Sequence, residues 1–74
     1  MTPKEFNALN QKKQADLIWN GKHVGDRKDA EHNILLYQID EELFVEIYYH
    51  VQHNVITKYI AMSKQELGSY LPKN

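Results

Sequence analysis

The spacing of apolar residues changes twice along the chain, which predicts a helix, then a group of strands, then a second helix. At the start, Thr2 and Glu5 have the spacing of a helical capping box, with Pro3 at the first helical position. The polar run 10–14 then interrupts the apolar stripe. The pattern therefore allows one helix or two, with Asn10 capping the second.

The end of this helical region carries a compact apolar group. Ala15, Ile18 and Trp19 recur at helical spacing, so we predict that Trp19 belongs to the core. Gly21 follows directly and is placed to end the helix as a left-handed cap.

The middle of the chain has the composition of strands. Residues 22–28 contain one strong apolar residue and indicate an edge strand, if they form a strand at all. Residues 34–39, 43–51 and 55–62 are rich in β-branched and aromatic residues, which strands favour. Because the gaps between them are short, the strands must pair as antiparallel hairpins.

The last element is a short helix. The run Ser63-Lys64-Gln65-Glu66 is a capping box, and Pro72 would stop the helix. Its apolar stripe consists of Leu67, Tyr70 and Leu71. The predicted fold over residues 1–74 is one α+β domain, with an N-terminal helix broken or not near Asn10, an antiparallel meander of three or four strands, and this short helix.

The registers of the hairpins decide which side chains share a face. Two-residue loops at Glu41-Glu42 and His53-Asn54 give mutually consistent registers and leave both faces of the sheet apolar. An antiparallel sheet usually has one wet face, so the surplus predicts an interaction surface unless the C-terminal helix covers it. The residues assigned to that surface share aromatic character: Tyr37, Phe44, Tyr48 and Tyr59.

Composition narrows the classes of function. A chain of 74 residues has a thin margin of stability, and its lack of cysteine excludes disulfides and thiolate metal sites. The net charge of −1 lacks the electrostatic footprint of a nucleic-acid-binding domain. Neither a signal peptide nor a membrane span is visible, so we expect a cytoplasmic protein without nucleic acid or membrane partners.

Candidate chemistry is sparse. Glu46, His50 and His53 are candidate ligand-binding or pH-sensitive residues, and full protonation of the four histidines would change the formal charge from −1 to +3. No motif supplies the three or four convergent ligands of a zinc site, and no nucleophile stands in a catalytic motif. We therefore expect no catalytic residue, metal or cofactor.

Several segments resemble a group of small uncharacterised bacterial proteins of similar length. They are Gln14 through Gly21, Ile34 to Tyr37, Phe44 to Tyr49 and Ile56 to Lys58. The resemblance implies a compact bacterial α+β fold and assigns no binding or catalytic residue.

These observations lead to two functional expectations. The first is a noncatalytic protein-interaction module, namely a small adaptor, an inhibitor, an immunity-type protein or a homodimer, acting through the aromatic face; a second copy is slightly favoured as the partner. The alternative is a small-ligand or nucleotide-binding domain. Its pocket would lie between the first helix and the sheet, with Glu46 or His50 at the mouth.

Overall fold

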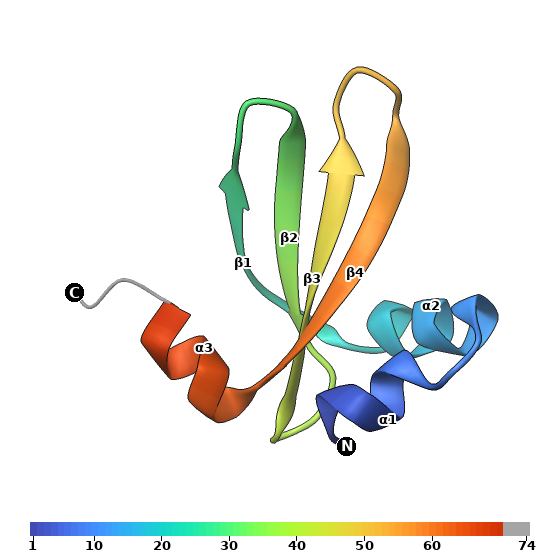
Figure 1. Ribbon diagram of the computed structural model, residues 1–74, viewed down its shortest axis with the longest axis vertical. Coiled ribbons are helices and arrows are strands. Elements are labelled where there is room, and N and C mark those ends of the chain that lie inside the picture. The colour runs from blue at the N-terminus through green and yellow to red at the C-terminus, as the bar shows by residue number, and fades with distance from the viewer. Residues whose placement is uncertain (71–74) are drawn as a thin grey trace.

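The computed structural model describes residues 1–70, and the side chains of residues 1–67. Figure 1 shows its seven elements. They are α1 (Pro3–Asn7), α2 (Gln11–Trp19), β1 (Lys22–Lys28), β2 (His32–Gln38), β3 (Leu43–His50), β4 (Val55–Ser63) and α3 (Lys64–Tyr70). The four strands form one antiparallel sheet in the order β1-β2-β3-β4. The predicted α+β class and the four-stranded meander are confirmed.

Side-chain caps fix the helix ends where the sequence indicated them. Thr2 and Glu5 exchange hydrogen bonds with each other's backbone N–H groups at 2.8 and 3.1 Å. Asn10 Oδ1 accepts from the backbone N–H of Lys13 at 2.9 Å, so the N-terminal region is two helices. Ser63 and Glu66 form the same reciprocal pair at the start of α3. The predicted stop at Pro72 lies outside the described residues.

Each face of the sheet carries its own apolar cluster. On the proximal face, defined here as the face against α1 and α2, the buried cluster consists of Phe6, Ile18, Leu43, Val45 and Ile47. On the distal face, the cluster consists of Leu36, Phe44, Met62 and Leu67. Leu67 belongs to α3, so this helix covers part of the second face, which is the alternative that the sequence left open.

The first hairpin differs from its predicted register by one residue, and the second differs by one residue up to Tyr48 and by two at Tyr49 and His50. The first loop holds three residues, because Asp40 Oδ1 accepts from the N–H groups of Glu42 and Leu43, both at 2.9 Å. Leu36 therefore pairs with Glu46 instead of Ile47. The second loop is also longer than two residues, and Asn54 N–H donates to His50 O. A slip of one residue moves a side chain to the other face, so the predicted division between the two faces is wrong.

Gly21 is needed for a reason other than the predicted one. No described residue other than Asn54 has a positive φ, so Gly21 is not a left-handed cap. A Cβ built at Gly21 would instead lie 2.9 Å from the carbonyl oxygen of Gln38. The close approach of the chain after α2 to the end of β2 is what requires glycine here.

Candidate interaction surface

Trp19 lies at the surface and not in the core. Its exposed fraction is 89%, whereas the neighbouring Ile18 is 5% exposed and belongs to the proximal cluster. Successive residues of a helix are about 100° apart, and α2 turns Leu17 and Ile18 towards the proximal cluster, which leaves Trp19 on the outer side of the helix. The prediction that Trp19 is buried is wrong, and a large aromatic side chain is left in solvent.

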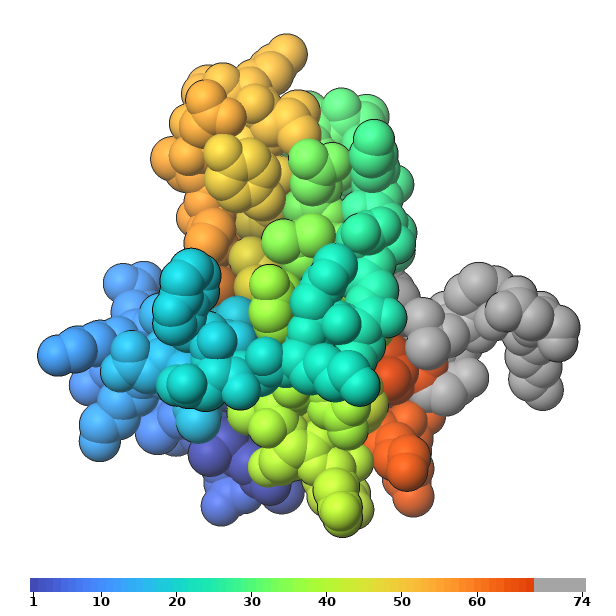
Figure 2. Space-filling model, turned by 180° about the vertical axis from the view of Figure 1, so that it is seen from behind, coloured from blue at the N-terminus to red at the C-terminus, as the bar shows by residue number. Residues whose placement is uncertain are grey.

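A groove of about 480 Å³ lies between α2 and β4. We call it the α2–β4 groove. Its lining comes from one side of α2 and from the first half of β4: Gln11, Lys12, Gln14, Ala15, Ile56, Thr57, Lys58 and Tyr59. Figure 2 shows the molecule from behind, with the blue helices at the base and the yellow and orange β3–β4 hairpin rising above them.

Trp19 and the groove are neighbours on α2. Ala15 lines the groove, and Trp19 follows it by four residues, which places both on the same side of the helix. Ile56 is 51% exposed and contributes apolar surface on the strand side. The groove and Trp19 therefore form one continuous candidate surface, which sequence reasoning missed. A usable signal was the run Leu17-Ile18-Trp19, because three successive helical residues span about 200° and cannot all face the core.

The backbone edges of the sheet are less suited to binding than this groove. In β1 the pairing with β2 shifts between His23 and Gly25, and in β4 the pairing with β3 shifts beside Thr57. Both edge strands thus carry a bulge, which interrupts the regular row of hydrogen-bonding groups that an added strand would need. Contacts through side chains are favoured over strand addition.

The predicted aromatic residues do not share a face. Tyr37 and Tyr59 pack against the proximal cluster, whereas Phe44 is buried in the distal cluster. Tyr48 pairs with Ile34 and Lys58 and lies on the distal side. The single aromatic face is therefore wrong, and its physical reason is the one-residue slip. Of the four residues, Tyr59 lines the groove.

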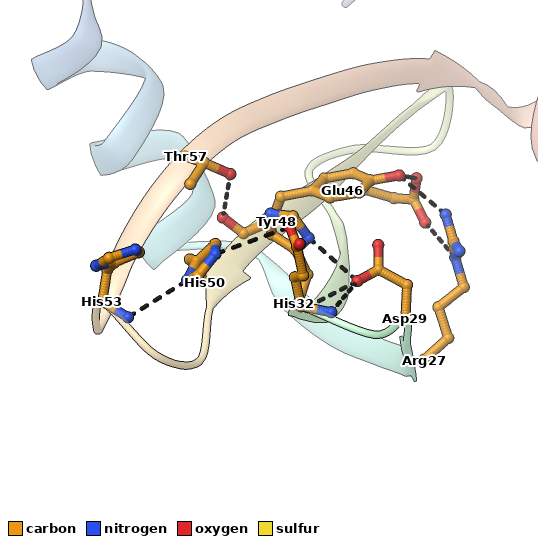
Figure 3. A network of polar contacts seen from close by, with 9 residues as sticks. Arg27, Asp29, His32, Glu46, Tyr48, His50, His53 and Thr57 are labelled. Atoms are coloured by element: carbon orange, nitrogen blue, oxygen red, sulfur yellow. Dashed lines mark hydrogen bonds and ion pairs between the residues drawn. The ribbon is translucent and has the colours of Figure 1, made fainter.

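Glu46 is the centre of a polar network on the distal face (Figure 3). It is 2% exposed, and Arg27 Nε donates to its Oε2 at 3.1 Å. Arg27 Nη2 also donates to the Tyr48 hydroxyl at 2.9 Å, and that hydroxyl donates to Glu46 Oε1 at 3.4 Å. Burial raises the pKa of Tyr48, and the negative charge of Glu46 raises this pKa further. Lys58 Nζ lies 4.5 Å from the centre of the Tyr48 ring. The network holds a buried carboxylate with charge-assisted partners.

Three histidines continue this face towards the hairpin ends (Figure 3). The rings of His32 and His50 meet edge to face across β2 and β3, with centroids 5.2 Å apart, and the centroid of the His53 ring lies 4.5 Å from that of His50. His32 Nδ1 is 3.1 Å from Asp29 Oδ1. The sequence did not indicate His32 as a member, because its place depends on strand register. In the described part of the chain, no three His, Asp or Glu side chains gather to hold a metal ion.

The structure does not bring Glu46, His50 or His53 to the α2–β4 groove. All of them lie outside its lining. A groove between the N-terminal helical region and the sheet was expected and is present, but its lining consists of amide, lysine, alanine and β4 side chains. The residues expected at its mouth belong to the distal network and to the hairpin end.

Comparisons with known proteins gave no relative. No family model matches the chain, and neither a curated protein nor a solved structure matches it. The resemblance to small bacterial proteins stays a prediction. Within residues 1–70, none of the helices is long and apolar enough to cross a membrane.

Proposed function

We propose that the protein is a noncatalytic protein-interaction module whose contact surface is Trp19 with the α2–β4 groove. The observation that carries the proposal is the 89% exposure of the only tryptophan in the chain, beside a concave surface. Tryptophan is highly buried on average in folded proteins, and it is among the residues most enriched at binding hot spots. An indole held in water next to a groove gains much from being covered.

The composition of the groove supports binding over catalysis. Its described lining holds amides, two lysines, one threonine hydroxyl and one tyrosine, with neither a carboxylate nor an imidazole. General acid–base chemistry near neutral pH most often uses those two groups. An adaptor, an inhibitor, an immunity-type protein and a homodimer all fit this surface. A cytoplasmic location is part of the proposal.

The proposal is tested by photo-crosslinking in the cells that make the protein. A photoreactive amino acid at Lys12 samples the groove, and the same group at Lys28 samples β1, at the opposite edge of the sheet. We expect a discrete crosslinked product from position 12 that position 28 does not give. Adding Trp19→Ala should remove it. Equal products from both positions, or a product that survives the loss of Trp19, would contradict the proposal.

The volume of the same groove favours the second candidate function, binding of a small ligand or nucleotide. Its roughly 480 Å³ falls within the range usual for ligand sites, and Lys12 could bind an anionic group. A saturable rise in melting temperature with a nucleotide, removed by Lys12→Ala, would support this function. An unchanged melting curve across nucleotides and divalent metals would argue against it.

A further inference from the structure

The exposed Trp19 side chain and the α2–β4 groove lie in the same surface patch. Trp19 projects from α2 one turn beyond Ala15, which lines the groove. A symmetric dimer has an isologous interface, in which one patch must supply both the inserted group and its receptor. The surface around α2 meets this condition, because each copy would offer one indole and one groove.

The charges of this patch in one copy also complement those of the same patch in a second copy. Lys12 lines the groove, whereas Asp16 precedes Trp19 by three residues and lies next to it on the helix surface. Insertion of Trp19 into the groove of another copy would bring Asp16 of the first copy towards Lys12 of the second. By symmetry, Asp16 of the second copy would approach Lys12 of the first. The Lys12 ammonium can also lie over the indole face, where the ring electrons attract a cation.

We propose that the occupant of the α2–β4 groove is a second copy of this chain, with Trp19 of each copy inserted into the groove of the other. The inference rests on the proposed function and names its partner. The bulge beside Thr57 disfavours the other simple dimer, in which two β4 edges would continue one sheet.

The area available predicts a weak dimer. An aromatic side chain buries roughly 150–250 Å², and each copy contributes one such side chain and one receiving surface. This sum stays below the roughly 800 Å² per partner of a standard interface, although Ile56 and the lysine stems add to it. We therefore expect association that depends on concentration in the micromolar range or above, as for small interfaces.

The full chain is tested by light scattering and tryptophan emission over a range of concentrations at neutral pH. The average mass should rise from 8.8 kDa towards twice this value. Trp19 emission should shift to the blue over the same concentrations, because the indole leaves water. Lys28→Ala, at the opposite sheet edge, is the matched control and should dimerise like the unmodified chain.

Two variants separate the inserted group from its receptor. Trp19→Ala keeps the groove and loses the indole, whereas Ala15→Arg keeps the indole and fills the groove. Both positions are exposed and helical, so both variants should fold and should be monomeric alone. In a mixture of the two variants, one of the two contacts can still form, in which Trp19 of the Ala15→Arg chain enters the groove of the Trp19→Ala chain. The tryptophan-free Trp19→Ala chain should therefore shift the emission of Ala15→Arg to the blue.

The outcomes distinguish this inference from the proposed function. A dimer that persists in Trp19→Ala, or a mixture without an emission shift, overturns the insertion. An unmodified chain that stays monomeric with solvent-exposed emission at every concentration overturns the second copy. In that case, a cellular crosslink from position 12 to a molecule of different mass would still uphold the interaction module. A crosslinked product of twice the chain mass supports both the interaction module and the second copy as its partner.

Discussion

Phe6 should contribute far more to stability than Trp19, although both are large aromatic residues of the N-terminal helices. Phe6 is fully buried and is the only buried residue of α1. Its ring meets that of Tyr59 edge to face, with centroids 6.4 Å apart and an interplanar angle of 73°. Phe6 therefore holds α1 against the sheet, whereas Trp19 leaves the monomer's packing almost untouched.

The expected magnitudes differ by several-fold. Replacing a buried Phe with Ala typically costs about 3–5 kcal/mol, since the lost burial is compounded by a cavity. A chain of 74 residues has a total stability of roughly 4–11 kcal/mol on the usual range per residue. Phe6→Ala should thus remove a large share of the stability. Trp19→Ala is a surface change and should stay within about 0.5 kcal/mol.

Urea unfolding followed by far-ultraviolet circular dichroism measures both changes. The work should use the lowest concentration that gives a signal, because dimerisation would add stability by mass action. Phe6→Leu provides a milder variant, with a cost of about 1 kcal/mol, if Phe6→Ala does not fold. A loss of more than about 2 kcal/mol in dilute Trp19→Ala, or none in Phe6→Leu, would refute the assigned orientation of the helices. If the destabilisation by Trp19→Ala grows with protein concentration, it reflects the loss of the dimer instead.

Three further predictions concern turns and close approaches. Gly21→Ala should destabilise by about 1–3 kcal/mol, because the added Cβ meets the Gln38 carbonyl oxygen at 2.9 Å. Gly25→Ala is the matched control and should be neutral in the same unfolding assay, since nothing lies within 4 Å of its added Cβ. Asn54→Ala should lose about 1 kcal/mol and Asn54→Gly less, because Asn54 has φ of 54°; equal losses in chemical unfolding would argue against a conformational cause. The pKa of Asp29 is lowered, first by the backbone N–H of Glu31 and also by that of His32. A lowered folded-state pKa gives stability that is present above the unfolded value near 3.9 and lost as pH falls through the folded value. Thermal melting between about pH 2 and 5 should therefore show an acid-induced loss that Asp29→Asn lacks, and identical pH profiles would contradict it.

Local signals predicted the elements because their physical causes are local. The capping boxes at Thr2 and Ser63 and the Asn10 cap depend on side chains within three residues of the groups they bind. Asn54 adopts a left-handed conformation, which Asn tolerates in turns because its own side chain can bond to the nearby backbone. The existence and order of the strands followed from their composition and the short gaps between them.

The candidate surface was harder to predict because it depends on register and on helix rotation. The Asp40 carboxylate lengthens the first loop by one residue, and this moves Phe44 and Tyr48 away from Tyr37. Nothing in the spacing of apolar residues distinguishes a loop of two residues from one of three. In α2, propensity allowed either Ile18 or Trp19 to face the sheet, and the packing of Phe6 and Ile18 in one cluster decided it.

The two sides of the sheet differ in what a partner could add to them. On the distal side, Glu46, Arg27 and Tyr48 already bind one another, and the described residues include no buried side-chain polar atom without a hydrogen bond. A partner there would have to replace bonds that are already made, with little net gain. In the α2–β4 groove, the gain comes from covering the highly exposed Trp19 indole and the half-exposed Ile56. The bulges limit binding at the strand edges, so this groove is where burial of apolar surface should drive association.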